Sequence, residues 1–162
     1  MTTAQDKSAA DVLHAAALRA TRSRVAVLEQ VRAHPHADVD SIATGVRRRI
    51  GSVSTQAVYD ALRSLTAAGL LRRLEPAGSP ARYEARVGDN HHHVVCRVCG
   101  TIRDVSCATG TAPCLDPSTD HGFVVDEAEV TFWGVCPDCQ ASLRADTTWQ
   151  QQATEKHQPS RS

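Results

Sequence analysis

The sequence predicts an α+β protein of two domains, a helical domain followed by a domain built on a small sheet. Three observations predict this class. The first half repeats apolar residues at helical spacing, the second alternates short apolar pieces with Gly, Pro and Asp, and two Cys-x-x-Cys pairs fall in the second half alone. The charge also divides: residues 1–82 hold twelve Lys/Arg against seven Asp/Glu (+5), and residues 83–162 hold six against eleven (−5). This split indicates two modules with different partners, and a polyanion would be one such partner.

Four helices are expected in the first half, and three of them follow side chains that cap a helix. The expected helices are residues 11–18, the segment after Thr21, residues 39–49 after Asp38, and the segment after Ser54. The last of these, "TQAVYDALRSLTAAG", spaces its apolar residues four and three apart and ends at Gly69.

A hairpin is expected after the fourth helix, with "LLRRL" and "ARYEA" as its strands and "EPAGSP" as its turn. Helix, tight turn, second helix and hairpin together make a winged helix-turn-helix. The alternative is a generic small helical domain that ends in a hairpin.

The second half is expected to form a small sheet from the pieces "HVVC", "TIRDV", "GFVV" and "EVTFWGVC". After Leu143 the chain is polar and without periodicity, which predicts a disordered tail. The expected boundaries are a winged-helix domain over 1–86, an α/β domain over 87–144 and a tail over 145–162.

The start "MTTAQDKSAADV" carries early charges and lacks the apolar core of a signal peptide. No apolar run is long enough to span a bilayer. We therefore expect a cytoplasmic protein with no membrane partner.

Two cysteine pairs match one another in the second half, Cys96-x-x-Cys99 and Cys136-x-x-Cys139. Cytosolic thiols stay reduced, so these cysteines suit metal better than disulfides. Two such pairs fit a closed tetrahedral zinc site of four thiolates with no open position for a substrate. A thioredoxin-like redox pair would need only one Cys-x-x-Cys, so the matched pairs favour structural zinc.

The stretch "NHHHVVCRVCG" places three histidines just before the first cysteine pair. In an extended segment side chains alternate between faces, so His91 and His93 share one face and His92 points the opposite way. Two imidazoles on one face make half of a metal site, and a solvated turn is the alternative.

Further donors for such a site occur elsewhere in the sequence. Glu84 ends the expected hairpin, Asp104 follows the first cysteine pair, and His34 lies in the "HPH" break of the first half. Imidazole with carboxylate suits Fe²⁺, Mn²⁺ or Zn²⁺ better than Ca²⁺. Spacing alone does not decide whether these residues form one site.

Several of these motifs occur together in one known family. "HPHAD", "STQAVYDALRSLTAAGLLRR", "RYE", "HHHVVCRVCG", "IRDV" and "WGVCPDC" resemble the ferric uptake regulator (Fur) family over residues 10–142. "GDNHHHVVCRVCG" with "TAPCL" looks most like the FurA-type, PerR-like peroxide-responsive branch of high-GC bacteria, often encoded beside a catalase-peroxidase. Sixteen Arg against two Lys agree with such a genome.

The resemblance implies a homodimeric, metal-dependent repressor and not an enzyme. Its fold would be an N-terminal winged helix-turn-helix DNA-binding domain followed by a small α/β dimerisation domain with a structural four-cysteine zinc site. Its partner would be double-stranded DNA with a palindromic operator. Its cofactors would be structural Zn²⁺ and regulatory Fe²⁺ or Mn²⁺.

Carried over residue by residue, the resemblance assigns three sets of side chains. The structural zinc would be held by Cys96, Cys99, Cys136 and Cys139. The regulatory metal, at the hinge between domains, would be held by His34, Glu84, His91, His93 and Asp104. DNA would be contacted by Arg19, Tyr59 and Arg63.

These assignments imply a mechanism. One ion bound by both halves fixes their relative angle, and so the distance between the two recognition helices of a dimer. A palindromic operator demands a fixed distance, so the metal would control affinity. Residues 47–49, three arginines, would contact phosphates or form a solvated helix end.

Two departures from the family pattern affect the metal sites. Many Fur proteins use a histidine of a further metal site where this chain has Ala128, so His92 is not expected to be a ligand. Peroxide sensors usually carry Asp at the position of Glu84, which favours the alternative of an iron-sensing repressor without ligand oxidation. A thiol-redox enzyme is a third alternative, and a filled five-ligand site argues against it. Cys107 and Cys114 are expected to be small buried hydrophobes.

Overall fold

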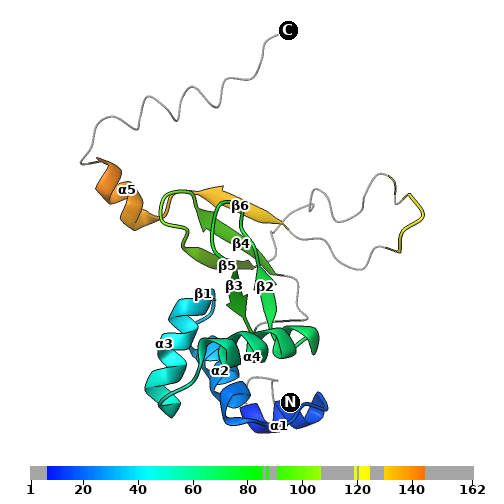
Figure 1. The fold of residues 1–162 in the computed structure, drawn as a ribbon. Helices are drawn as coiled ribbons and strands as arrows, with labels where there is room; N and C mark the ends of the chain where they lie inside the picture. The colour runs from blue at the N-terminus through cyan, green and yellow to red at the C-terminus, as the bar shows by residue number, and fades with distance from the viewer. Residues whose placement is uncertain are drawn as a thin grey trace. The chain divides into compact units, whose positions relative to one another are not determined.

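The computed structural model describes residues 7–85, 87, 91–106, 119, 121–124 and 130–144. The chain divides into two compact units, Met1–Asp89 (unit 1) and Asn90–Ser162 (unit 2). The described part of unit 1 holds four helices and three short strands, and that of unit 2 holds three strands and one helix (Figure 1). The expected tail over 145–162 lies outside the described residues.

Each helix of unit 1 begins behind a side chain that accepts a hydrogen bond from the backbone N–H three residues further on. The helices are α1 (Ala9–Ala15), α2 (Arg22–Ala33), α3 (Val39–Ile50) and α4 (Thr55–Ala67). Their capping residues are Ser8, Thr21, Asp38 and Ser54, of which the last three are those predicted from the sequence.

The first helix is shorter than predicted, because it ends at Ala15 and not near Leu18. Ala17 adopts a left-handed conformation (φ 55°), and the Leu18 N–H then donates to the Leu13 carbonyl at 2.8 Å. This closure reverses the chain and satisfies a carbonyl of the last turn.

The predicted hairpin forms from β2 (Arg72–Leu74) and β3 (Arg82–Glu84), which pair antiparallel. A third strand, β1 (Ala37–Asp38), pairs with the other side of β3, so the order is β1-β3-β2 (Figure 1). At two residues β1 is too short to leave a periodic pattern in the sequence. Helices α3 and α4 with this hairpin confirm the winged helix-turn-helix.

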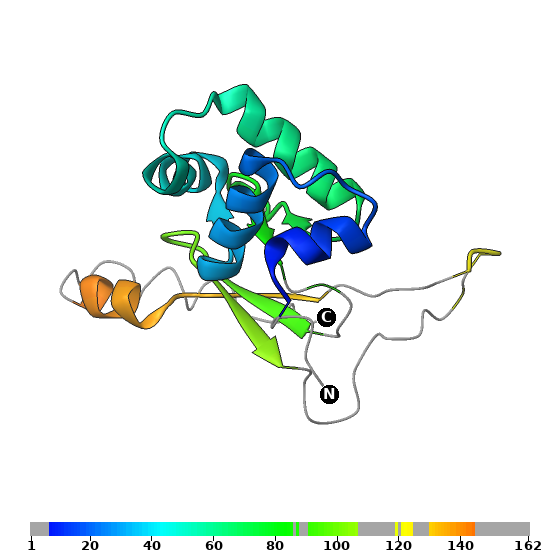
Figure 2. The same ribbon diagram turned by 90° about the horizontal axis from the view of Figure 1, so that it is seen from below.

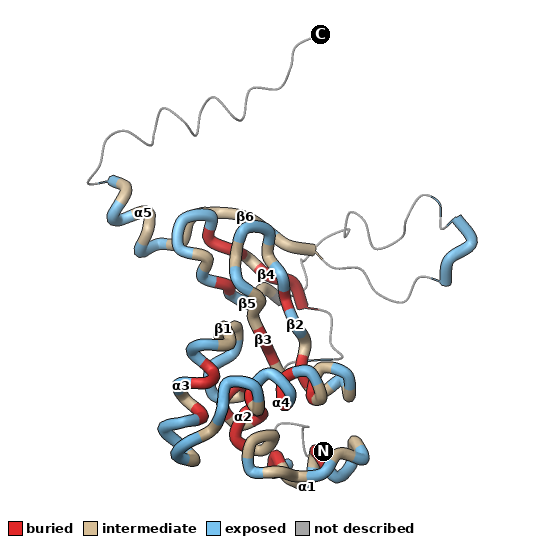
Figure 3. Tube along the Cα trace, in the orientation of Figure 1, coloured by how far each residue is buried: buried red, intermediate tan, exposed pale blue. Residues whose placement is uncertain are grey.

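The core of unit 1 lies among its helices, with α2 in contact with α1, α3 and α4 (Figure 2). The largest fully buried apolar side chains are Leu13, Leu28, Ile42, Leu62 and Leu65. Buried residues occur along α2, α3 and α4 (red in Figure 3). Helix α3 lies so close to α2 that a Cβ at Gly45 would meet the side chain of buried Gln30 at 2.2 Å. The core therefore fixes α4 on α2 and α3 through its apolar face.

Unit 2 is built on a sheet with the strand order β5-β4-β6. Its central strand β4 (His91–Cys96) pairs antiparallel with β5 (Ile102–Ser106) and parallel with β6 (Thr131–Gly134). Helix α5 (Pro137–Arg144) follows β6, with proline at its first position, where a missing N–H costs nothing. The α+β class predicted from the sequence is confirmed.

One expected strand of unit 2 does not form in the described residues. Residues 121–124, which contain most of "GFVV", make a turn followed by irregular chain. Phe123 and Val124 are 75% and 96% exposed. An apolar pair becomes a strand only where a neighbouring strand pairs its backbone groups. Within the described residues no helix is long and apolar enough to cross a membrane.

Candidate metal centre and nucleic-acid interface

The sheet of unit 2 brings the two Cys-x-x-Cys pairs together. Strand β4 ends at Cys96 and β6 ends at Gly134, and the register pairs these two residues, so both cysteine pairs leave the same end of the sheet. The first pair lies in a turn in which the Gly100 N–H donates to the Cys96 carbonyl at 2.9 Å. Cys136 directly precedes α5 and Cys139 lies in its first turn.

The geometry of this cluster fits zinc. The four Sγ atoms lie within 4.8 Å of one another, and those of Cys99 and Cys136 are 3.7 Å apart. Four thiolates at ~2.3 Å around a tetrahedral ion lie about 3.8 Å from each other. The structure therefore brings together the four cysteines predicted as one set, and a site with four protein ligands is closed to substrate.

The pKa values of the clustered thiols indicate what a bound cation would change. Desolvation raises the pKa of Cys96, but the N–H groups of Cys99, Cys136 and Val98 outweigh it and lower the pKa to about 6. The pKa of Cys139 is raised to about 12, chiefly by its hydrogen bond with Cys136 and by desolvation. At neutral pH the four thiols do not all ionise unaided, whereas a divalent cation stabilises all four thiolates.

The three histidines of β4 are buried, and they alternate between the faces of the sheet as predicted. The rings of His91 and His93 lie 4.8 Å apart, edge to face. His93 is paired across strands with Asp104, and its Nε2 lies 3.7 Å from the Asp104 Oδ1. His92 points the other way, with its ring 6.2 Å from that of Phe132.

Unit 1 contains a second histidine–carboxylate pair, His36 with Glu84. The His36 Nε2 lies 3.0 Å from the Glu84 Oε2, and the two side chains are 9% and 1% exposed. His36 adopts a left-handed conformation (φ 62°), and its N–H donates to the Tyr83 carbonyl at 2.8 Å. It directly precedes β1, which pairs with the strand that carries Glu84.

His34, the histidine predicted as a ligand from this segment, lies elsewhere. It is the C-terminal cap of α2 and is exposed. The structure brings His36 to Glu84 and does not bring His34 there. The resemblance implied His34 alone as the ligand from "HPH". His36, at the other end of this segment and directly before β1, was not among the predicted residues.

The two kinds of donor set expected from the sequence are thus both present. Four thiolates suit zinc, and imidazole with carboxylate suits Fe²⁺ or Mn²⁺. Cys107, Cys114 and Ala128 lie outside the described residues.

Helix α4 presents the predicted DNA-contacting side chains to solvent. Tyr59 is 48% exposed, and the Arg63 side chain is 78% exposed. A cleft of about 650 Å³ opens beside them between α4 and the hairpin. It is lined by Gln56, Tyr59, Arg63, Thr66, Ala67, Arg73 and Tyr83. Its lining includes two arginines and two tyrosines, residue types that donate hydrogen bonds to phosphates in protein–DNA complexes.

The other arginines predicted to contact DNA differ in whether their side chains already bond within unit 1. Arg19 is exposed ahead of α2, and its carbonyl accepts from the Arg24 guanidinium at 3.1 Å. In the run of three arginines, Arg47 donates to the Thr55 hydroxyl at 2.9 Å. Arg49 pairs with Glu29 at 2.9 Å. Arg47 therefore ties the end of α3 to the start of α4, and it is engaged within the fold.

The chain combines a winged helix, whose helix α4 exposes a tyrosine and an arginine, with a cluster of four cysteines that could hold a metal ion. This combination indicates a metal-dependent DNA-binding regulator. Comparisons with known proteins narrow this class. Residues 15–133 match the Ferric uptake regulator family.

Individual relatives agree with this match. Transcriptional regulator FurA of Mycobacterium tuberculosis is 62% identical over 133 residues, which cover 82% of this chain and 90% of the relative. The peroxide operon regulator of Bacillus subtilis is 29% identical over 139 residues, which cover 82% and 92%. The Helicobacter pylori ferric uptake regulator Fur has a similar fold, with a TM-score of 0.61 at 21% identity over 80% of this chain and 87% of that one.

The chain belongs to the ferric uptake regulator family. It is a metal-responsive transcriptional regulator, and members of the family bind DNA and act as dimers. They are not enzymes, which removes the thiol-redox enzyme among the alternatives.

Proposed function

We propose that this chain is a peroxide-responsive repressor that binds a palindromic operator in double-stranded DNA as a homodimer. Its regulatory site takes Fe²⁺ or Mn²⁺, and its target is a catalase-peroxidase gene, as the resemblance to the FurA-type branch implies. The proposal is supported by the FurA relative and by the more distant relative named as a peroxide operon regulator.

For the regulatory metal we assign five ligands and replace one that the sequence predicted. They are His36, in place of His34, together with Glu84, His91, His93 and Asp104. The observation that carries this assignment is the 3.0 Å contact between the His36 imidazole and the buried Glu84 carboxylate. A cation held by both units would fix their relative angle and so select one spacing of the recognition helices in a dimer.

For the structural metal we assign zinc to the four clustered cysteines. Their sulfur spacing and closed donor set support a structural role. Zinc there would join the two ends of unit 2, which are separated by more than thirty residues of chain.

For DNA we assign α4 to the major groove, with Tyr59 and Arg63 as base or phosphate contacts. Arg19, exposed ahead of α2, would contact a phosphate. Among the arginines at the end of α3, Arg48 is the better candidate for a phosphate contact, because Arg47 and Arg49 bond within the fold.

The test compares the full chain loaded with zinc and Fe²⁺ with the same chain loaded with zinc and Mn²⁺. A bound Fe²⁺ would supply the electron that cleaves hydrogen peroxide, whereas a bound Mn²⁺ would not readily do so. We expect peroxide to abolish DNA binding of the Fe²⁺ form with a gain of one oxygen on His36 or His91. The Mn²⁺ form is expected to keep its affinity.

Peptide mass spectrometry separates the alternatives. Oxygen found only on cysteines would replace the proposal with a thiol switch. Absence of any oxidation, with DNA binding that still follows Fe²⁺, would leave an iron-sensing repressor. Glu84, where peroxide sensors usually carry Asp, is the feature that favours the iron sensor.

A further inference from the structure

The exposed face of α4 carries an acidic side chain among the residues assigned to DNA. Gln56, Tyr59, Asp60 and Arg63 follow one another at spacings of three, one and three, which places them on one face of a helix. All four are exposed. The opposite face, with Val58, Ala61, Leu62 and Leu65, is buried in the core of unit 1.

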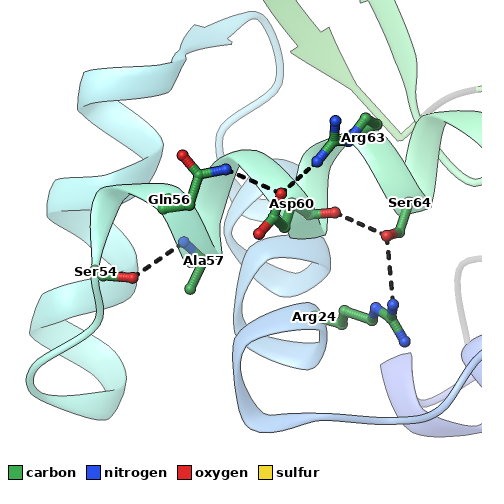
Figure 4. Close-up of polar contacts among 7 residues, drawn as sticks. All are labelled: Arg24, Ser54, Gln56, Ala57, Asp60, Arg63 and Ser64. Carbon is green, nitrogen blue, oxygen red and sulfur yellow. Dashed lines mark hydrogen bonds and ion pairs between the residues drawn. The ribbon is translucent and has the colours of Figure 1, made fainter.

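One carboxylate oxygen of Asp60 joins two neighbours on this face (Figure 4). The Asp60 Oδ1 accepts from the Gln56 Nε2 at 3.1 Å and from an Nη2 of Arg63 at 2.5 Å. The backbone carbonyl of Asp60 accepts from the Ser64 hydroxyl at 2.8 Å, and Ser64 in turn meets the Arg24 guanidinium at 3.3 Å. Gln56, one turn before Asp60, and Arg63, one turn after it, are thus both held toward the Asp60 carboxylate.

A carboxylate at this position opposes DNA binding in general. Duplex DNA carries one negative charge per ~1.7 Å of its axis, and each phosphate repels an approaching carboxylate. The paired Arg63 also has part of its charge neutralised before it meets a phosphate. If α4 contributed only to the affinity for DNA, a neutral residue at this position would give tighter binding.

The side chains of Gln56, Asp60 and Arg63 are of the types that recognise bases. In the major groove arginine pairs with guanine, glutamine with adenine, and aspartate accepts from the amino group of cytosine. On a DNA sequence that matches these side chains, base contacts replace the Asp60–Arg63 and Asp60–Gln56 contacts. On a DNA sequence that does not match, the same contacts break and no base contact replaces them.

We propose that Asp60 is a specificity-determining residue of α4, one that disfavours unmatched DNA and holds Gln56 and Arg63 for base contact. The proposal rests on the assignment of α4 to the major groove. The simpler role of an Asp60–Arg63 pair is a small contribution to helix stability, as exposed ion pairs one turn apart give. That role predicts no change in sequence preference when the charge is removed.

The experiment uses the full chain loaded with zinc and Mn²⁺, and two duplexes. One duplex is selected by the native protein from a random library, and the other is a shuffled sequence of the same composition. For Asp60→Asn we expect severalfold tighter binding to the shuffled duplex and a ratio of the two affinities about tenfold smaller, the low end of one base contact. Asp60→Glu should recover most of the ratio.

Asp40→Asn is the matched control, because it removes one exposed carboxylate from α3 of the same unit. We expect it to leave the ratio unchanged. A repeat of the library selection with Asp60→Asn should give relaxed preferences at specific base pairs, with an unaltered thermal midpoint of unfolding.

Two results would overturn the proposal: an Asp60→Asn ratio equal to the native one, or an equal loss of ratio in Asp40→Asn. The proposed function fails in a different way. In that case the native Mn²⁺-loaded protein would select no sequence from the library at all, and the inference on Asp60 would fall with it.

Discussion

Among the described residues of unit 1, fifteen buried side chains form one apolar core, whereas in the described part of unit 2 the buried apolar side chains are Val95, Cys96 and Ile102. The other buried residues of that part are the three histidines of β4. Burial of one large apolar side chain contributes about 1.5–3 kcal/mol. Unit 1 therefore has the apolar burial that an independent fold needs, and the described part of unit 2 has a much smaller share.

This difference indicates what each unit depends on. A small sheet with few buried apolar groups needs another source of stability, and metals commonly supply it in small domains. We propose that the four-cysteine cluster is that source in unit 2, since a bound zinc would join β4 to the start of α5. Metal chemistry should therefore affect folding in unit 2, and apolar packing should dominate in unit 1.

The largest expected effect follows from the loss of one zinc ligand. Cys96→Ser or Cys136→Ser removes a thiolate from a site whose binding energy is folding energy, on the order of 10 kcal/mol. We expect each variant to lose zinc, to unfold unit 2 and to dissociate the dimer, while the helical circular dichroism of unit 1 is largely kept. Metal analysis and sedimentation measure these outcomes.

Cys107→Ser is the matched control, since it makes the same chemical change outside the two pairs. It should keep one zinc per chain. If Cys96→Ser or Cys136→Ser also kept one zinc per chain and stayed dimeric, the four-cysteine assignment would be wrong, and so would the dependence of unit 2 on metal.

The second prediction tests the apolar packing of unit 1 and leaves the cysteine cluster of unit 2 unchanged. Leu65 on α4 is fully buried, and Leu65→Ala leaves a cavity in the core of unit 1. We expect unit 1 to lose about 2–5 kcal/mol of unfolding free energy, as large-to-small changes in a core do. Zinc content, measured on the same sample, should not change. A fall in zinc content with Leu65→Ala would show that the two units do not fold separately.

The third prediction concerns a metal that both units are proposed to share. His36→Ala removes an imidazole that contacts Glu84, and His34→Ala removes one from the exposed end of α2, two residues earlier. We expect His36→Ala to weaken Mn²⁺ binding by at least the 10–100-fold typical of residues that support a metal site. His34→Ala should stay within about twofold.

Titration calorimetry of the zinc-loaded chains measures both constants. A larger loss with His34→Ala would restore the ligand expected from the sequence. Equal losses would mean that the whole "HPH" segment matters to the site through its backbone.

The sequence predicted most of unit 1 because its determinants are local. Thr21, Asp38 and Ser54 cap helices, and the apolar spacing after each cap defines the buried face. The pairing of β1 with β3 is not local, since it joins residues more than forty apart. It decides which histidine meets Glu84, and no spacing within "HPH" contains that information.

In unit 2 the two cysteine pairs and the shared face of His91 and His93 could be predicted from the sequence, because both follow from short-range patterns. The strand predicted at "GFVV" does not form in the described residues 121–124, because these apolar residues are not paired there with a neighbouring strand. The role of Asp60 could not be seen in the sequence either, since it depends on how three exposed side chains meet on α4.

The smallest expected effect tests whether unit 1 also relies on its local caps. The N–H of Ser41, followed by its hydroxyl and by Arg82, stabilises the Asp38 carboxylate and lowers its pKa below the usual value. Because the folded pKa is the lower one, this stabilisation is complete above the unfolded pKa of about 3.9 and is lost as pH falls through the folded pKa. Asp38→Ala should cost about 0.5–2 kcal/mol at neutral pH, the usual value of a helix cap.

Asp38→Asn keeps an acceptor for the Ser41 N–H, so it should be close to native at low pH. It should lose less stability than the native chain as pH falls below about 4 and through the folded pKa of Asp38. Urea unfolding followed by circular dichroism measures the difference. Loss of zinc in acid is common to both chains and cancels in the comparison. If both chains lost equal stability over this range, the carboxylate would have no part in the pH dependence of unit 1, and the cap at α3 would act as a neutral acceptor alone.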